Sequence, residues 1–240
     1  MNLNGKTALV TGGAVRIGRA VCRTLAAAGA DVVIHYNRSA TPAEALRHEL
    51  VAMGRRAFCI QADLGGEDAG RRLVAAAREV AGPLDVLINN AAVFHQDSLL
   101  TLTARALRDE FEVNLFAPLL LMRAFAEACG DGAIVNLLDR RIASLDHSCL
   151  PYVLAKKALA EATQMAALEL APSIRVNAVA PGAILPPPGE GAGHLKDRAG
   201  PVPLQRQCTP EQVAAAVIFL LQNDALTGQI IFVDGGQHLL

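Results

Sequence analysis

Residues 7–20 read TALVTGGAVRIGRA. The stretch begins with a short apolar run, turns at Gly12 and Gly13, and enters a helical pattern at Gly18. A glycine-rich turn between a strand and a helix allows a pyrophosphate to approach the free backbone amides of the helix N-terminus. Because any strand-to-helix turn favours glycine, the meaning of this loop depends on what surrounds it in the chain.

Short apolar runs like this one recur between longer stretches of helical periodicity. The expected strands are 7–11, 31–36, 57–61, 85–89, 133–138, 174–180 and 230–234, and the expected helices are 17–29, 42–53, 67–81, 105–129, 152–171 and 210–223. The runs show little polar alternation, as is typical of parallel strands covered on both faces. This alternation predicts an α/β fold of the Rossmann type, a doubly wound parallel seven-stranded sheet with helices on both faces. Ligands bind outside the carboxyl ends of the strands in such folds.

No repeat or linker interrupts the alternation, so residues 1–240 are expected to form a single dinucleotide-binding and catalytic domain. The segment 181–207 is dense in proline and glycine and is expected to be a substrate-binding loop, because long loops in compact domains are usually functional. Two helix starts, TPAEAL (41–46) and TPEQVA (209–214), each offer a threonine N-cap, a proline at the first helical position and a nearby glutamate.

The composition argues against several classes of protein. The formal net charge is −1 and no basic stripe occurs, which disfavours nucleic acid or an anionic membrane as the main partner. No apolar run approaches the ~18 residues of a membrane span, and the N-terminus lacks the pattern of a signal peptide. Five cysteines and six histidines are widely scattered, which indicates a cytoplasmic protein with no metal site.

The end of the second expected strand bears on the choice of dinucleotide. NAD sites place an acidic residue there for the ribose 2′-hydroxyl, whereas residues 35–40 read HYNRSA and contain none. Arg16 and Arg38 are expected to flank a 2′-phosphate, with a hydrogen bond from Ser39, because guanidinium groups suit phosphate geometry. The alternative is two solvated surface arginines, but their paired placement favours NADP(H) as the cofactor.

Residues 152–156 read YVLAK, which sets Tyr152 four residues before Lys156 at the start of an expected helix. Residues at this spacing share a helix face about 5–6 Å apart. An ammonium so close is expected to lower the pKa of Tyr152 and suit it to acid–base chemistry. The alternative is an ordinary helix face.

A set of motifs now resembles the short-chain dehydrogenase/reductase family over essentially the whole chain. The motifs are Thr11-Gly12 through Gly18, NNAA (89–92), Asn114, Tyr152 with Lys156, PG (181–182) and VDGG (233–236). The resemblance implies that Tyr152 is the catalytic acid, that Lys156 binds the nicotinamide ribose, and that Asn114 holds a proton-relay water.

The resemblance also implies the cofactor contacts. They are Gly12, Arg16, Ile17 and Gly18 in the first loop, Asn37, Arg38 and Ser39 after the second strand, Asp63 and Leu64 at the adenine, Asn90 and Ala91 at the ribose, and Tyr152, Lys156, Pro181, Gly182 and Ile184 at the nicotinamide. Pro186 stands where the family usually has a phosphate-binding threonine.

Asp139 departs from the family, whose catalytic serine usually occupies this position before the tyrosine. An ionised aspartate would repel the oxyanion of a reacting ketone, although a protonated one could donate to it. Next to a ring nitrogen that gains a proton, a carboxyl group serves as acid, relay or orienting acceptor, so Asp139 favours C=N reduction. The alternative is an inactivating replacement, or a salt bridge from Asp139 to Arg140 or Arg141.

Arg16, the HYNRS stretch at 35–39, Asp139 and Phe94 together resemble the pteridine reductase and dihydromonapterin reductase branch of the family. The resemblance implies that Phe94 and the nicotinamide sandwich a flat pterin ring, which Arg16, Asp139 and Tyr152 also contact. The alternative for Phe94 is a core position. Ala92 and Cys149 differ from the serine and tyrosine usual in this branch.

The sequence thus predicts an NADPH-dependent oxidoreductase that transfers a hydride to a C=N bond of a dihydropterin or similar flat heterocycle. One alternative is a carbonyl or 3-oxoacyl reductase, and another is a non-catalytic NADPH-binding sensor. The helices at 105–129 and 152–171 carry wide apolar faces, and the resemblance implies that these helices pair between subunits. A homotetramer or dimer is therefore expected, with a monomer as the alternative.

Overall fold

The computed structural model describes residues 1–184 and 201–240, and its centre is one seven-stranded parallel sheet. The strands are β1 (Thr7–Val10), β2 (Asp31–Tyr36), β3 (Ala57–Gln61), β4 (Val86–Asn89), β5 (Gly132–Leu137), β6 (Ile174–Pro181) and β7 (Ile230–Val233). Their order is β3-β2-β1-β4-β5-β6-β7, so the chain builds outward first to one side of β1 and then to the other. The expected sheet is confirmed, with every strand within one residue of its predicted ends.

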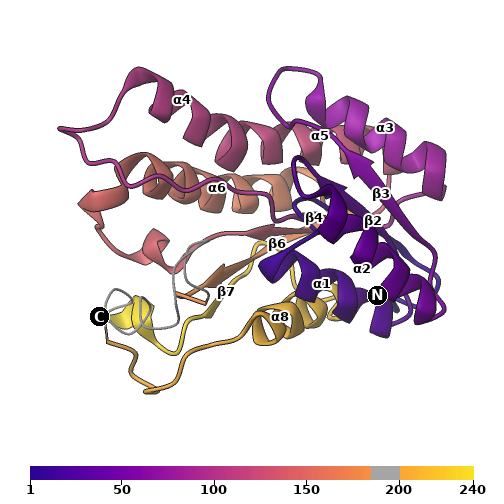
Figure 1. Cartoon of the computed structure of the whole chain (residues 1–240). Helices are drawn as coiled ribbons and strands as arrows, with labels where there is room; N and C mark the ends of the chain where they lie inside the picture. Colours follow the sequence, from indigo (N-terminus) through magenta and orange to yellow (C-terminus); the bar gives the residue numbers. More distant parts are fainter. Residues whose placement is uncertain (185–200) are drawn as a thin grey trace.

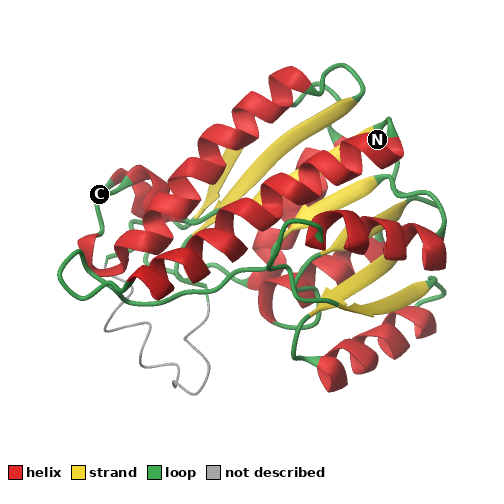
Figure 2. Cartoon of the chain, turned by 90° about the horizontal axis from the view of Figure 1, so that it is seen from above, coloured by secondary structure: helices red, strands yellow, loops and turns green. Residues whose placement is uncertain are grey.

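Helices cover both faces of this sheet (Figure 1). They are α1 (Arg16–Ala27), α2 (Ala40–Ala52), α3 (Ala69–Ala81), α4 (Ala104–Phe111), α5 (Ala117–Cys129), α6 (Leu150–Glu169) and α8 (Pro210–Gln222). One apolar core joins α1, α2 and α8 to the sheet, and a second joins α3, α5 and α6 to the opposite face. Seen from above, the strands fan out beneath the helices in the twist usual for parallel sheets (Figure 2).

The long helix expected at 105–129 is interrupted, which corrects the sequence prediction. A π-helical turn, Glu112–Phe116, separates α4 from α5. Pro118 has no N–H to donate to the carbonyl of Asn114, so the α-helical ladder cannot run through this turn unbroken. Such π turns are frequent at functional sites, and this one carries Asn114.

The two expected threonine caps have different outcomes. Thr209 caps α8 in a reciprocal capping box, in which its side chain accepts from the backbone of Gln212 and the Gln212 side chain accepts from its backbone. The cap expected at Thr41 is wrong, because the chain turns helical earlier: α2 begins at Ala40, and the N–H of Ala43 already bonds to the carbonyl of Ser39.

Two features are absent from the residues that the structure describes. No helix among them is long and apolar enough to cross a membrane. In the same part of the chain, no group of three or more His, Cys, Asp or Glu side chains is arranged to hold a metal ion. The expected loop at 181–207 is described only at its two ends, and Pro186 lies outside the described residues.

The two threonines form a matched pair for a stability test. Thr209→Ala removes both halves of a capping box and should lower the free energy of unfolding by about 1 kcal/mol. Thr41→Ala, in the same Thr-Pro context but without a capping hydrogen bond, should cost clearly less. Urea unfolding of both variants checks this, and equal losses would contradict the assignment of the caps.

Candidate active site

The centre of the sheet is the point where the strand order reverses, between β1 and β4. The loops after these strands are tied together by Thr11 and Asn90. The Thr11 hydroxyl accepts the N–H groups of Asn90 and Ala91 at 2.9 and 3.0 Å, and the Asn90 amide donates to the carbonyls of Thr11 and Gly12 at 2.9 and 3.0 Å. Asn90, expected at the cofactor ribose, therefore also fixes the shape of the glycine loop.

The glycines of this loop leave no room for side chains. Gly12 has φ +60°, and a Cβ on it would lie 3.0 Å from the Cα of Ala91. A Cβ on Gly18 would collide with the carbonyl oxygen of Gly12. Bare backbone therefore surrounds the N-terminus of α1, which fits the phosphates of a dinucleotide.

His35, a buried residue of β2, braces the same loop. Its Nδ1 accepts the N–H of Gly12 at 3.2 Å, which leaves Nε2 to donate to the carbonyl of Ala62 at 3.1 Å. Its own carbonyl accepts the N–H of Gly13 at 3.0 Å. Burial lowers the pKa of His35, so the imidazole is neutral as these contacts require. His35 stood out in the sequence only as part of the HYNRS stretch, because a single sequence does not show which groups a strand residue faces.

The residues expected around the 2′-phosphate lie at one edge of the sheet. Arg16 begins α1 with φ +54°, and Arg38 and Ser39 follow β2. Because β1 and β2 are adjacent and parallel, both segments leave the sheet at its carboxyl edge. Both arginines are exposed, and the described residues around this edge offer cationic groups and a hydroxyl to a phosphate.

The remaining expected adenosine contacts extend this edge. Ile17 is half-buried against the first core, Asn37 is exposed after β2, and Leu64 is buried after β3. Asp63 accepts the N–H of Gly65 at 3.0 Å, which fixes its side chain at the end of β3.

Tyr152 and Asp139 meet at the end of β5. The Tyr152 hydroxyl donates to Oδ2 of Asp139 at 3.2 Å. Lys156, one turn further along α6 and 3% exposed, donates from Nζ to the carbonyl of Leu137 at 2.8 Å. The structure therefore brings together the three residues that the spacing of the sequence placed in one site.

The expected lowering of the Tyr152 pKa is wrong for this structure. Burial raises the pKa of Tyr152 well above its usual value, and the carboxylate of Asp139 raises it further. Burial also lowers the pKa of Lys156 to about 8, against the opposing effects of Asp139 and Glu110. Sequence spacing revealed the nearby ammonium but not the burial and the carboxylate that raise the pKa of Tyr152.

Asn114 is fully buried in the π turn, and its amide is held from both sides. It donates to the carbonyl of Val93 at 2.9 Å and to Glu110 at 2.5 Å, and its own oxygen accepts the N–H of Val93 at 3.3 Å. Glu110, also fully buried, accepts hydrogen bonds from the backbone N–H and the ring Nδ1 of His95 at 2.6 and 2.8 Å. Burial raises the pKa of Glu110.

Glu110 and His95 are site residues that the sequence prediction missed. The only signal was an acidic residue four positions before Asn114, on the same helix face. An acid on a surface helix usually faces solvent, so this signal does not separate Glu110 from its exposed neighbours.

Phe94 lies at the mouth of the site and is 42% exposed, so the alternative of a core position is wrong. Its ring meets that of Tyr152 edge to face, with centroids 4.9 Å apart.

Cys149, beside Tyr152, is buried, and burial raises the pKa of its thiol to about 12, so it stays protonated. The alternative of a salt bridge from Asp139 also occurs in part, because Arg141 pairs with the Asp139 carboxylate at 3.2 Å while Tyr152 donates to the same carboxylate.

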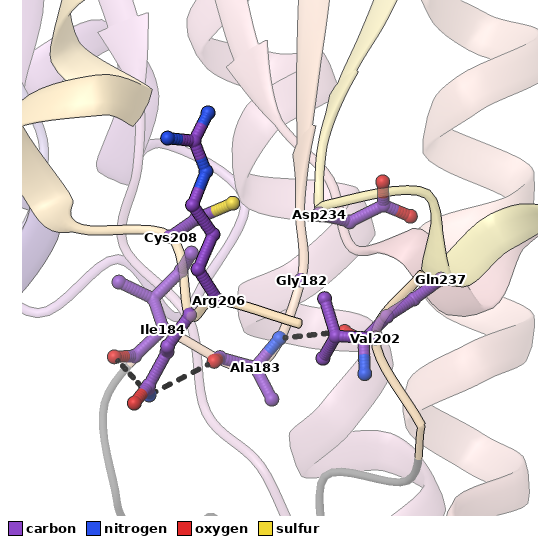
Figure 3. Close-up of a pocket in the computed structure, with 9 residues that line it drawn as sticks. Gly182, Ala183, Ile184, Val202, Arg206, Cys208, Asp234 and Gln237 are labelled. Atoms are coloured by element: carbon purple, nitrogen blue, oxygen red, sulfur yellow. Dashed lines mark hydrogen bonds between the residues drawn. The ribbon is translucent and has the colours of Figure 1, made fainter. Parts of the chain in front are cut away.

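The chain after β6 is braced where the nicotinamide is expected. The N–H of Gly182 donates to Val233 at 3.0 Å, continuing the sheet contact beyond Pro181. Gln207 donates to the carbonyls of Ala183 and Ile184 at 3.2 and 2.9 Å. A small pocket is lined by Gly182, Ala183, Ile184 and Gln207 together with Asp234 and Cys208 (Figure 3). Gln207 was not predicted, because nothing in the sequence of the 181–207 segment marks it.

The chain is similar to known proteins over most or all of its length. A family profile described as Enoyl-(Acyl carrier protein) reductase matches residues 13–238. FolM alternative dihydrofolate reductase 1 of Brucella canis, solved in complex with NADP, is 39% identical, with a TM-score of 0.92 over 100% of this chain and 96% of that one. A short chain dehydrogenase of Burkholderia cenocepacia J2315, also with NADP, is 37% identical, with a TM-score of 0.91 over 98% of each chain. Pteridine reductase 1 of Leishmania tarentolae is 35% identical and aligns with 97% of this chain and 96% of its own length.

The contact between His35 and the glycine loop predicts a pH-dependent stability. Because burial lowers the pKa of His35, the unfolded chain takes up a proton here at a higher pH than the folded protein does. Stability should therefore fall as the pH drops below about 6.5, the usual histidine value. His35→Gln keeps a hydrogen-bond acceptor for Gly12 but does not titrate, so this variant should lose less stability on acidification than the unaltered protein.

Urea unfolding of both proteins without cofactor, at about pH 7 and pH 5, measures this difference directly. Other titrating groups contribute equally to the two proteins and cancel. The same loss of stability in both proteins would show that His35 is not the neutral brace of the loop.

Proposed function

Because the chain belongs to the short-chain dehydrogenase/reductase family and to its pteridine-reductase-like branch, we propose that it reduces a C=N bond of a dihydropterin or a similar flat heterocycle. The protein is an NADP-dependent oxidoreductase. The observation that carries the proposal is the hydrogen bond from Tyr152 to Asp139, which sets a carboxyl group where a carbonyl reductase presents a serine hydroxyl.

The cofactor fits the carboxyl edge of the sheet. The glycine loop offers backbone to the pyrophosphate, and Arg16, Arg38 and Ser39 would bind the 2′-phosphate. Asn37, Asp63 and Leu64 would surround the adenine, and Asn90, Ala91 and Ile17 would line the way to the nicotinamide. Lys156 would bind the nicotinamide ribose, beside the backbone of Pro181, Gly182 and Ile184. Bound NADPH supplies the hydride.

The residues of the chain would orient the substrate and supply the proton. The substrate carbon of the C=N bond gains the hydride, and its nitrogen gains a proton from the Tyr152–Asp139 pair. Phe94 offers a ring face at the mouth of the site, which suits a flat heterocycle. Arg16 would reach the substrate as well as the phosphate.

Asn114 and Lys156 would complete the proton path. Lys156 is buried with a pKa of about 8, so it still carries its charge at neutral pH and stabilises negative charge that develops on Tyr152. Asn114 is fixed by Val93 and Glu110 with its amide in the same region, where it would hold a water that reloads the pair.

We also propose that the enzyme is a cytoplasmic homo-oligomer, either a tetramer or a dimer. Leu154, Met165 and Leu168 lie exposed on α6, and Phe116 and Leu119 are exposed at the start of α5. Large apolar side chains grouped on two helices favour contact with a second subunit. The five cysteines are free, which suits a reducing compartment.

The direct test is NADPH oxidation by the purified protein with a dihydropterin at saturating cofactor. We expect turnover of about 1 s⁻¹ or faster, the range of ordinary enzymes. Tyr152→Phe should lower kcat by at least about 100-fold, because it removes the proton donor. NADPH binding without turnover, and without any effect of Tyr152→Phe on function, would instead support a dinucleotide sensor.

Asp139→Ser separates the imine reductase from the carbonyl reductase. A serine donates to an oxyanion, so the variant should gain activity on ketones and lose at least about tenfold in kcat/KM on the dihydropterin. Asp139→Asn is the matched control, since it keeps the shape and removes the charge. Ketone activity in the unaltered protein that exceeds its dihydropterin activity would overturn the proposal.

A further inference from the structure

Arg141 contacts both carboxylate oxygens of Asp139, the partner of Tyr152, although nothing in the proposed reaction uses it. It lies two residues after Asp139 in a short 3-10 turn (Arg140–Ala143), with its side chain 23% exposed. Its backbone N–H donates to Oδ1 of Asp139 at 2.8 Å, and its Nη1 lies 3.2 Å from Oδ2. Oδ2 is the same oxygen that accepts the Tyr152 hydroxyl.

Two further contacts hold the guanidinium in place. Nε donates to Asp146 at 2.9 Å, and Asp146 in turn accepts the backbone and hydroxyl of Ser148 at 3.0 and 2.6 Å. On its other side, the guanidinium lies over the ring of Phe94, 5.6 Å from the centroid, within the range of a cation–π contact. Arg141 therefore connects Asp139, Asp146 and the ring that faces the substrate.

The titratable groups around Asp139 come from three elements. Tyr152 and Lys156 face it from α6, Arg141 from its own turn, and the buried thiol of Cys149 from the turn before α6. Arg141 is the cation that makes direct hydrogen bonds to the carboxylate, whereas Lys156 donates to a backbone carbonyl. A guanidinium at hydrogen-bond distance favours the ionised form of a carboxyl group.

We propose that Arg141 is a positioning residue that holds Asp139 as a carboxylate, so that Asp139 accepts hydrogen bonds in the reaction and Tyr152 alone gives the proton. The catalytic part of this inference rests on the proposed function. The hydride and the Tyr152 proton then add across the C=N bond, and the tyrosine is reloaded from solvent. The carboxylate selects a substrate with an N–H group beside the reacting bond, which a simple ketone lacks.

The chain allows Asp139 to be read out without substrate or cofactor. It has no tryptophan and two tyrosines, so Tyr36→Phe leaves Tyr152 as the only tyrosine. A carboxylate that accepts a hydrogen bond from a tyrosine quenches its fluorescence, because it takes up the phenolic proton in the excited state. Acid titration of this parent protein should therefore show a rise in tyrosine fluorescence when Asp139 takes up a proton, and Asp139→Asn should abolish the transition.

In this background, Arg141→Met should move the midpoint of the transition up by at least about 1 pH unit. Arg140→Met is the matched control, since it removes one positive charge from the same turn, and it should move the midpoint less than half as far. Arg141→Lys keeps the charge without the planar guanidinium, so its midpoint should lie between those of Arg141→Met and Arg140→Met. This variant also provides the test if Arg141→Met does not fold. Equal midpoints in the parent and both Arg141 variants would overturn the proposal, as would a transition that persists in Asp139→Asn.

Steady-state kinetics test the catalytic part. Arg141→Met should lower kcat on the dihydropterin about tenfold and shift the acid limb of its pH profile upward, with the KM for NADPH unchanged. An unshifted pH profile would contradict a role through Asp139. If the protein turned over no dihydropterin at all, the proposed function would fail, while the fluorescence titration would still decide the role of Arg141.

Discussion

The strand order reverses between β1 and β4, and the hydrogen bonds of Thr11 and Asn90 hold together the two loops that part there. Parallel sheets open a crevice at such a point, and a ligand can enter it only if the loops stay in register. Glycines shape the first loop, and His35 supports it from the neighbouring strand. The shape of the cofactor edge thus depends on hydrogen bonds within the chain itself.

The chemistry is concentrated in buried charge on the other side of that crevice. Lys156 and Glu110 are removed from water, and Asp139 is largely buried between Tyr152 and Arg141. Burying charged groups is costly unless each finds partners, and hydrogen bonds supply partners to all three. Asp139, which stands in place of a serine, therefore has Arg141 as its counter-ion. The same guanidinium also lies over the ring of Phe94.

Much of this arrangement was predictable from the sequence. The strands were found because buried parallel strands are continuous apolar runs, and the site because Tyr152, Lys156 and Asp139 sit at informative spacings. The π turn was not, because apolar periodicity continues through it and only Pro118 marks the break. The pKa of Tyr152 was misjudged since spacing shows a neighbouring lysine but not burial. Glu110 was missed because charged residues in helices usually face solvent, and Arg141 was named only as a possible salt-bridge partner of Asp139.

In the proposed reaction, the site delivers a hydride to a ring carbon next to a nitrogen. Transfer of deuterium from NADPH labelled at the nicotinamide C4 position tests it most directly, with the product of dihydropterin reduction analysed by NMR. We expect deuterium on one face of the carbon of the former C=N bond, with the nitrogen proton drawn from solvent. The proposed reaction would be contradicted if a ketone tested in parallel gave an alcohol with deuterium at its carbinol carbon while the heterocycle carried no deuterium.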